Sequence, residues 1–279
     1  MTRRDLIRTA TGFAAAAATA RPASQTLKAG IQTNAWKIIG DDFSSLLGVL
    51  EHIRSLGYEG FETGFRDVQP AFGKLKDAKA QIAETGLRFL GCHISLSNYD
   101  SKTNIAPTEQ IEQVADGAAG LGAERLILSG APVSEEGPLD EQRVRWKAGA
   151  LSRAGRHCQG MKLRVCYHNR AAEFANGAAE LIGLMRETDP DSVRFMIDAG
   201  YALTAKADIA GFFTKYHKRI DGLHLREFNA FQYEPLAIAI KKAKWTGWLV
   251  AGEERENGAK PGDEAARPAR EQIRKLFGV

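Results

Sequence analysis

Strand-like and helix-like segments alternate about eight times along the chain, in units of roughly thirty residues. A short apolar run such as 193–197 is typical of a strand that is buried on both faces, as in a parallel sheet. Alternation of such strands with amphipathic helices indicates an α/β protein. Strands are predicted at 29–33, 60–64, 87–95, 125–130, 163–169, 193–200, 222–227 and 248–251, and helices at 41–56, 71–85, 107–121, 139–159, 177–187, 209–217, 235–243 and 265–277.

Eight such units predict a single (β/α)₈ TIM barrel. The main alternative is an open, doubly wound sheet that binds a dinucleotide. That alternative is weakened because no Gly-x-Gly-x-x-Gly pattern follows the first strand. No linker, low-complexity stretch or block of charge divides the 279 residues. We therefore predict one domain, over residues 27–279.

The N-terminal segment has the composition of an export signal. Arg3 and Arg4 form a twin-arginine pair, a weakly apolar run follows over 11–18, and 18–20 offers small residues to a signal peptidase. The apolar run is too short to span a bilayer. We predict that residues 1–26 are an export signal and a short linker, and that the mature protein is periplasmic or secreted, without a membrane segment.

Charge and cysteine content narrow the class of protein further. The formal net charge is +4, and the 38 Lys and Arg residues are scattered rather than gathered in a basic stripe. Nucleic-acid binding needs such a stripe, so we predict no nucleic-acid partner. Cys92, Cys158 and Cys166 are odd in number and lack paired spacing. We expect buried free thiols rather than a disulfide framework.

Ligand-type side chains occur at the ends of six predicted strands. A lone Asp at such a place is often only a helix N-cap, so only the whole set of side chains indicates a functional site. The carboxyl ends of barrel strands meet at one mouth, where active sites are built. Carboxylates mixed with imidazoles suit Mn²⁺, Zn²⁺ or Co²⁺. The members of the set are Glu62, His93, His168, Asp198, His224 and the pair Glu253 and Glu254.

Five motifs make the sequence similar to a known family. They are Gly-Tyr-Glu-Gly-Phe-Glu at 57–62, Tyr-His-Asn-Arg-Ala-Ala-Glu-Phe at 167–174, Ile-Asp-Ala-Gly at 197–200, His-Leu-Arg-Glu at 224–227 and Gly-Trp-Leu-Val at 247–250. With these motifs the chain resembles the xylose isomerase-like TIM-barrel superfamily, in its sugar phosphate isomerase/epimerase group. The resemblance extends from about residue 27 to the end.

The resemblance implies one divalent metal at the carboxyl mouth, held by residues of strands five to eight. Asp198 and His224 match the metal ligands of strands six and seven. Either His168 or Glu173 would supply the ligand of strand five. The residues that the resemblance implies for substrate binding are Glu62, His93, Asn169 and Arg226.

The sequence departs from the family pattern at three positions. Relatives often have histidine where this chain has Arg170 and Tyr201. The strand-eight glutamate that usually binds the metal falls on Gly252. Glu254 shares a face with that position and Glu253 is adjacent, so a shift of register would let one of them replace it. We predict Glu254 as the fourth metal ligand; if neither replaces it, the metal site is incomplete.

The resemblance implies isomerisation or epimerisation of a sugar or keto-sugar through an enediolate intermediate. A divalent metal (Mn, Zn or Co) polarises a carbonyl, and a carboxylate or histidine moves the proton beside it. Glu173, Glu253 and Glu254 are the candidate acid–base residues. Because an exported enzyme meets few phosphorylated sugars, we expect an unphosphorylated carbohydrate such as a 3-keto-glycoside.

Two other functions stay open. The first is a metal-dependent lyase or hydrolase of a keto-glycoside, which would use the same metal and base. The second is a non-catalytic sugar-binding barrel that has lost its metal, for which Gly252 and Tyr201 are the motivating departures. The partner is a small carbohydrate in every case, and a homo-oligomer is compatible with each of them.

Overall fold

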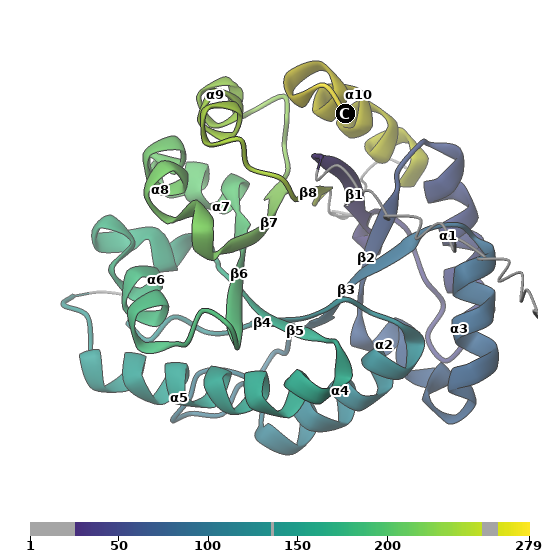
Figure 1. The fold of residues 1–279 in the computed structure, drawn as a ribbon, viewed down its shortest axis with the longest axis horizontal. Coiled ribbons are helices and arrows are strands. Elements are labelled where there is room, and N and C mark those ends of the chain that lie inside the picture. Colours follow the sequence, from purple (N-terminus) through teal and green to yellow (C-terminus); the bar gives the residue numbers. More distant parts are fainter. Residues whose placement is uncertain (1–25, 135–136, 253–261) are drawn as a thin grey trace, which may run out of the picture.

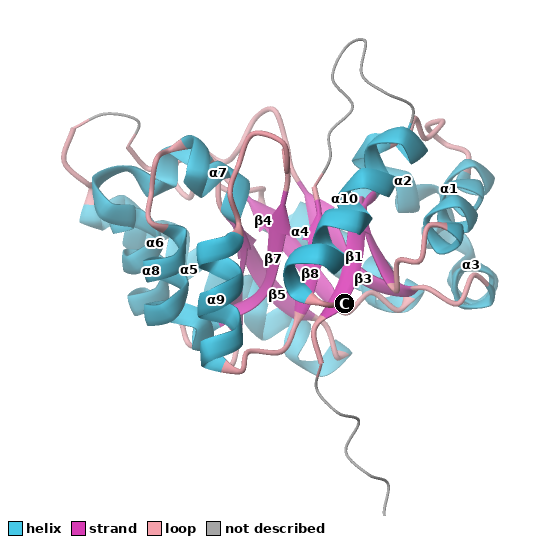
Figure 2. Cartoon of the chain, turned by 90° about the horizontal axis from the view of Figure 1, so that it is seen from above, coloured by secondary structure: helices cyan, strands magenta, loops and turns pink. Residues whose placement is uncertain are grey.

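The computed structural model describes residues 26–134, 137–252 and 262–279. Eight parallel strands close into a barrel in sequence order, and β1 pairs with β8. Helices surround the strands, as Figure 1 shows down the barrel and Figure 2 shows from the side. The prediction of a single (β/α)₈ TIM barrel is confirmed.

The strands lie close to their predicted positions. Most of their residues are buried on both faces, which is why they read as continuous apolar runs in the sequence. Their bounds are β1 Lys28–Gln32, β2 Gly60–Gly64, β3 Arg88–Ile94, β4 Arg125–Ser129, β5 Arg164–His168, β6 Val193–Asp198, β7 Ile220–Leu225 and β8 Trp248–Ala251.

Helices follow the strands and cover the outside of the barrel. Short 3₁₀ segments, named η, stand beside several of them. The α-helices are α1 Phe43–Ser55, α2 Phe65–Val68, α3 Leu75–Glu84, α4 Thr108–Leu121, α5 Glu141–Cys158, α6 Ala175–Glu187, α7 Ala199–Thr204, α8 Ile209–Tyr216, α9 Glu234–Ala243 and α10 Gly262–Phe277; the 3₁₀ segments are η1 Thr33–Ala35, η2 Gln69–Lys74, η3 Gln159–Met161, η4 Ala171–Phe174 and η5 His217–Arg219. None of these described helices is both long and apolar enough to cross a membrane.

The structure differs from the predicted elements in several places. The helix predicted at 71–85 begins only at Leu75, because Lys74 has non-helical backbone angles and a 3₁₀ segment precedes it. The strand predicted at 193–200 ends at Asp198, whose side chain caps α7. The strand predicted at 222–227 begins two residues earlier and ends at Leu225. Short helices α2 and α7, directly after β2 and β6, were not predicted.

Apolar side chains fill the lower part of the barrel and leave its carboxyl end polar. Leu90, Trp248 and Val250 form one interior cluster, and Ile127, Cys166 and Met196 form another. Gly91 makes room for this packing, since a Cβ there would lie 2.3 Å from Ile127 Cδ1. The three cysteines are free and buried, as predicted.

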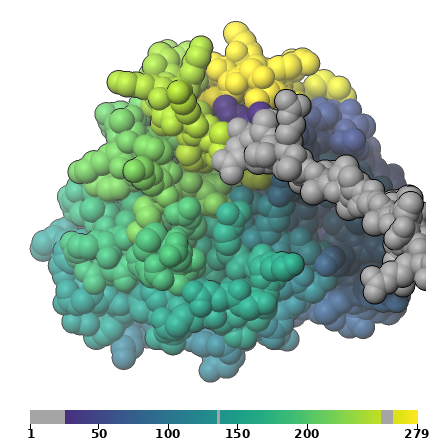
Figure 3. All heavy atoms as spheres, in the orientation of Figure 1, coloured from purple at the N-terminus to yellow at the C-terminus, as the bar shows by residue number. Residues whose placement is uncertain are grey.

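The first and last units of the barrel are neighbours. Figure 3 shows yellow C-terminal atoms packed beside purple and blue atoms of the N-terminal part. Trp36, just after η1, donates a hydrogen bond of 2.9 Å from Nε1 to Asp263 Oδ1 in α10. This contact joins the two ends of the described chain beside the carboxyl mouth.

Candidate active site

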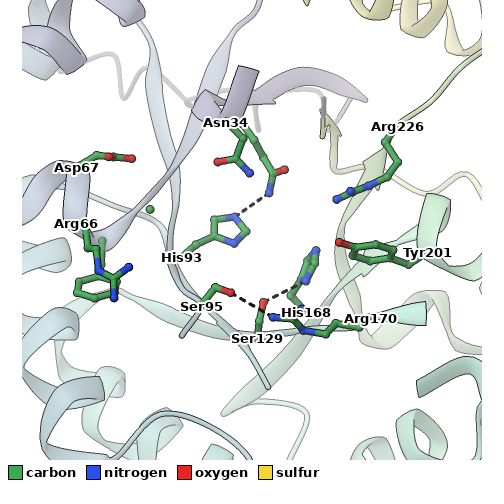
Figure 4. Close-up of a pocket in the computed structure, with 13 residues that line it drawn as sticks. Asn34, Arg66, Asp67, His93, Ser95, Ser129, His168, Arg170, Tyr201 and Arg226 are labelled. Carbon is green, nitrogen blue, oxygen red and sulfur yellow. Dashed lines mark hydrogen bonds between the residues drawn. The ribbon is translucent and has the colours of Figure 1, made fainter. Parts of the chain in front are cut away.

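A polar pocket of about 450 Å³ opens at the carboxyl ends of the strands. Figure 4 shows Arg66 and Asp67 on one side of it, Arg226, Tyr201, His168 and Arg170 on the other, and His93 between them. The residues that line it are Gln32, Asn34, Gly64, Phe65, Arg66, Asp67, His93, Ser95, Ser129, His168, Arg170, Tyr201 and Arg226.

Glu62, on β2, lies beneath the pocket and is fully buried. Its Oε2 is 2.8 Å from His93 Nε2 and 2.7 Å from His224 Nε2. Burial on its own would raise the pKa of this carboxyl, but the neighbouring His224 and His93 hold the pKa well below its usual range. The carboxylate is therefore ionised and shared by two imidazoles.

His224 joins this pair to a second group of side chains. Its Nδ1 lies 2.9 Å from Nε2 of His168, and His168 Nε2 lies 3.6 Å from Asp198 Oδ2. The other ring nitrogen of His168 is 3.2 Å from Ser129 Oγ. Burial lowers the pKa of His168 to about 4, so its imidazole is neutral near pH 7 and has a lone pair for a cation or a proton.

Asp198 is positioned by its own strand end and by Asn169. Its Oδ1 accepts a hydrogen bond of 2.8 Å from the backbone N–H of Tyr201, so Asp198 is also the N-cap of α7. Asn169 Oδ1 accepts from the Asp198 N–H at 2.9 Å, and Asn169 Nδ2 donates to the Asp198 carbonyl at 3.3 Å. Asn169, predicted to bind substrate, is fully buried and holds Asp198 in place.

Arg226 lies at the rim, between Asp198 and an aromatic ring. Its Nη2 is 2.7 Å from Asp198 Oδ2, and its guanidinium carbon is 4.2 Å from the centre of the Tyr201 ring. Such a stacked and paired guanidinium is held in one orientation. Tyr201, one of the departures from the family pattern, therefore supports the arginine that lines the pocket.

We expect Gly200→Ala to displace Arg226 and to lower the free energy of unfolding by about 1–3 kcal/mol. A Cβ on Gly200 would lie 2.2 Å from Arg226 Cγ, closer than packed carbon atoms allow. Urea unfolding measures the loss. Gly48→Ala in α1 is the control, because nothing lies within 4 Å of its new methyl group. A Gly200→Ala protein as stable as the wild type would contradict this packing.

Glu173, the predicted strand-five ligand or acid–base residue, lies outside the pocket. Its Oε1 accepts a hydrogen bond of 2.9 Å from Lys147 Nζ and a second one from the Tyr167 hydroxyl. Its Oε2 accepts from the Arg170 N–H at 2.6 Å. The geometry thus makes Glu173 a positioning residue for the backbone that carries Arg170, and leaves the strand-five position of the cluster to His168.

Glu253 and Glu254 lie outside the described residues, so their predicted roles as ligand and acid–base residues stay predictions. The position before them is described. A Cβ on Gly252 would lie 3.2 Å from Gln32 Oε1 and 3.6 Å from Arg226 Nη2. Among the described residues, strand eight thus brings no carboxylate to the mouth at the position where the family pattern has one.

Asp67 is a pocket residue that the sequence reasoning missed. It follows β2 on the short helix α2, and its Oδ2 accepts a hydrogen bond of 2.7 Å from Thr63 Oγ1. Burial raises the pKa of Asp67 above its usual value, while the hydrogen bond from Thr63 opposes this. The available signal was its place directly after a barrel strand, where residues reach the mouth.

The cluster has the composition of a divalent-metal site. One group of ligand atoms, from Glu62, His93 and His224, lies within 4.8 Å of one another, and so does a second group, from His168, Asp198 and His224. Glu62 Oε1 is buried and has no hydrogen-bond partner among the described residues. Imidazole nitrogens, ionised carboxylates and a spare carboxylate oxygen fit Mn²⁺, Zn²⁺ or Co²⁺.

The fold and the site together define a class of protein: a TIM barrel with a buried histidine–carboxylate cluster under a polar pocket at its carboxyl mouth. The chain belongs to the xylose isomerase-like TIM barrel family, whose model matches residues 50–276.

Solved structures of sugar epimerases and isomerases share this fold. An L-ribulose 3-epimerase matches with a TM-score of 0.76 and 16% identity, over 91% of this chain and 95% of that one. A sugar phosphate isomerase/epimerase from Parabacteroides distasonis matches with a TM-score of 0.69 and 20% identity, over 90% and 94%. The 3-keto-D-glucoside 4-epimerase of E. coli matches with a TM-score of 0.69 and 16% identity, over 91% and 100%.

Curated relatives bear a different activity in their names. An inosose dehydratase from Lacticaseibacillus casei is 22% identical over 251 residues, which cover 74% of this chain and 81% of that protein. Another, from Geobacillus kaustophilus, is 34% identical over 77 residues, 28% of this chain and 25% of that protein.

Proposed function

We propose that this protein is a divalent-metal-dependent isomerase or epimerase of a sugar or keto-sugar. The observation that carries the proposal is the polar pocket of about 450 Å³ directly above the buried cluster around His224. A monosaccharide has polar groups on all sides, and this pocket offers amide, hydroxyl, imidazole, guanidinium and carboxylate groups to them. Membership of the xylose isomerase-like TIM barrel family supports the same class of reaction.

In this proposal the metal ligands and Arg226 have separate roles. When bound, a divalent cation supplies the positive charge that polarises a substrate carbonyl. The candidates to hold it are His224 with Glu62 and His93, or His224 with His168 and Asp198. Arg226, fixed against Tyr201, donates hydrogen bonds to substrate oxygens.

A proton must leave the carbon beside the carbonyl and return at another place or face. Asp67 is the carboxylate among the described residues that line the pocket. Its raised pKa brings it nearer to the range in which a group both takes and releases a proton. We therefore propose Asp67 as an acid–base residue, beside the predicted Glu253 and Glu254.

We expect Asp67→Asn to lower kcat by about 100-fold with little change in KM, because the amide cannot accept the proton. Steady-state kinetics on a converted sugar measure the effect. Asp116→Asn is the control, since Asp116 lies outside the pocket, 2.9 Å from His157 Nε2 on the surface. An Asp67→Asn enzyme with the wild-type kcat would remove Asp67 from the acid–base role.

The proposed function is tested with the metal-loaded protein and a panel of keto-sugars and 3-keto-glycosides in deuterated water. NMR detects deuterium that enters beside the carbonyl, and mass spectrometry identifies the products. Isomerisation or epimerisation gives deuterated products with an unchanged carbon skeleton and no loss of water. Sugar binding without exchange or conversion across the panel would overturn the enzyme proposal and favour a sugar-binding barrel.

A lyase is the second candidate, because curated relatives are named inosose dehydratase. Elimination of water beside a carbonyl also begins with removal of a proton, so the same cluster and acid–base residue would serve. The panel separates the two reactions, since dehydration yields a product that has lost one water and hydrolysis of a glycoside yields two fragments.

We further propose that residues 1–26 direct twin-arginine export to the periplasm or beyond. Residues 1–25 lie outside the described part of the chain, so the support is the sequence pattern alone. Fusion of 1–26 to a reporter that is active only after export tests this. Replacement of Arg3 and Arg4 by lysine should retain the reporter in the cytoplasm, and unchanged export would contradict the proposal.

A further inference from the structure

Two clusters share His224. The cluster that includes Glu62 has a buried carboxylate that lies between two imidazoles. Glu62 is fully buried, and its Oε2 lies within 2.8 Å of two imidazole nitrogens. Its Oε1 has no hydrogen-bond partner in the described part of the chain. A buried carboxylate oxygen without a partner is costly, so this one points to a ligand that the site is built to receive.

A change of register in the sheet aims His93 at Glu62. The pairing of β2 with β3 shifts between Phe61 and Glu62, so that Phe61 faces Phe89 and Glu62 faces Gly91. The extra residue in β3 lets both Leu90 and His93 face the barrel interior, although they are three residues apart. Bulges next to active sites commonly re-aim a side chain in this way.

Asp198, in the other cluster, already lies against a cationic side chain. Oδ1 accepts from the Tyr201 N–H. Oδ2, like Glu62 Oε1, has no hydrogen-bond partner among the described residues, but it forms an ion pair of 2.7 Å with Arg226 Nη2. A cation on Oδ2 would compete with this guanidinium and be repelled by its charge. No arginine or lysine is paired with Glu62 among the described ion pairs, which join it to His93 and His224.

We infer that the divalent cation of this protein is held by Glu62, His93 and His224, on strands two, three and seven. This places it at the Nε2 side of His224, beside strands two and three, rather than at the Nδ1 side, beside the ligands implied for strands five and six. Glu62 thereby takes the part of the strand-eight carboxylate, whose position is Gly252. The inference rests on the metal dependence in the proposed function and specifies the ligands.

The geometry of the three side chains suits this role. Tetrahedral ligands about 2.1 Å from a cation lie roughly 3.4 Å apart, so the present spacings need only a modest opening. Asp198 and Arg226 then remain paired and available to orient a substrate. His168 stays beside His224, whose ring it holds through the 2.9 Å contact to Nδ1.

Cobalt binding to the full-length protein, stripped of metal with a chelator, tests the inference without any assay of turnover. The d–d absorption of Co²⁺ reports affinity and ligand type in one titration. We expect Glu62→Gln to weaken Co²⁺ binding by at least about 100-fold, more than loss of an outer-shell partner costs. His93→Gln is the second variant, and circular dichroism confirms that each protein is folded.

Two further variants separate the competing ligand sets. Asp198→Asn, and Glu253→Gln with Glu254→Gln in one protein, should each change Co²⁺ affinity by less than about tenfold. Asp67→Asn is the matched control, because it removes a carboxylate from the same pocket that does not contact the three ligands. A loss of at least about 100-fold in Asp198→Asn or in the double variant, with Glu62→Gln unaffected, would overturn the inference.

The remaining outcomes are also decisive. A wild-type protein that binds no Co²⁺ overturns the inference. Glu62-dependent binding without conversion of any sugar supports the metal site and leaves only the proposed function refuted. Sugar conversion by a protein whose Co²⁺ affinity is indifferent to Glu62→Gln and His93→Gln refutes the site and keeps the function.

Discussion

Replacement of Lys147 by methionine is expected to lower the free energy of unfolding by ~3–5 kcal/mol. Lys147 lies in α5 and its side chain is fully buried. Its Nζ is 2.9 Å from Glu173 Oε1 and 2.7 Å from Glu180 Oε1, and it donates to the Ala131 carbonyl at 2.9 Å. Without the ammonium group, two buried carboxylates face each other with no cation between them.

The loss of stability in Lys147→Met arises from uncompensated negative charge, so it should depend on pH. Burial already raises the pKa of Glu180 in the wild type. Lys147 opposes this rise, so without it the pKa of the Glu180 carboxyl would be higher still in the folded state. A carboxyl whose pKa is raised by folding makes the protein less stable as the pH rises. The deficit of Lys147→Met should consequently be larger near pH 8 than near pH 5, as urea unfolding at the two values would reveal.

A triple variant provides the control for this prediction. Lys147→Met with Glu173→Gln and Glu180→Gln removes the charges together, so most of the lost stability should return. A second control is Arg186→Met, which breaks an exposed ion pair of 2.7 Å with Glu141 and should have a much smaller effect. A loss below about 1 kcal/mol in Lys147→Met would contradict the structural role of this network.

The barrel was predictable because each strand can be recognised from its own local sequence. Residues 125–129 and 248–251 are short apolar runs between helical segments, and a parallel strand buried on both faces has just this composition. The short helix α2 was missed because four residues are too few to show a helical period. Asp67 was missed with it, because it lies within this helix and not at a predicted strand end.

The function of each residue at the carboxyl mouth was harder to predict than which residues lie there. Glu62, His93, His168, Asp198 and His224 do converge, because each lies among the last three residues of a barrel strand. The register shift beside Glu62 cannot be read from a two-residue alternation, and it is what turns His93 inward. Whether a carboxylate oxygen of Glu62 or Asp198 is paired depends on contacts with residues that are distant in sequence.

The role of Glu173 was also not predictable from the sequence. It follows β5 within a motif of the family, and this made it a candidate ligand and acid–base residue. Its partner Lys147 is 26 positions away, in a helix whose buried lysine looks like any other charged residue in the sequence. A carboxylate near a barrel mouth can thus serve the scaffold, and only the three-dimensional contacts distinguish the two uses.

We expect the largest loss of activity from His224→Gln, because His224 belongs to both candidate cation groups. The substitution should lower kcat/KM by at least about 10³-fold, equivalent to ~4 kcal/mol of transition-state stabilisation. Its Nε2 faces Glu62 and its Nδ1 faces His168, so no other single side chain links the described ligand groups. Steady-state kinetics on the sugar identified by product analysis, together with Co²⁺ titration, measure the effect.

His157→Gln is the matched control for this prediction. His157 is a partly exposed histidine at the end of α5, 2.9 Å from Asp116, and it is remote from the pocket residues in the described structure. It should retain wild-type kcat/KM and Co²⁺ affinity. If His224→Gln binds Co²⁺ and turns over sugar like this control, neither group around His224 holds the metal, and the reaction must depend on residues elsewhere in the mouth.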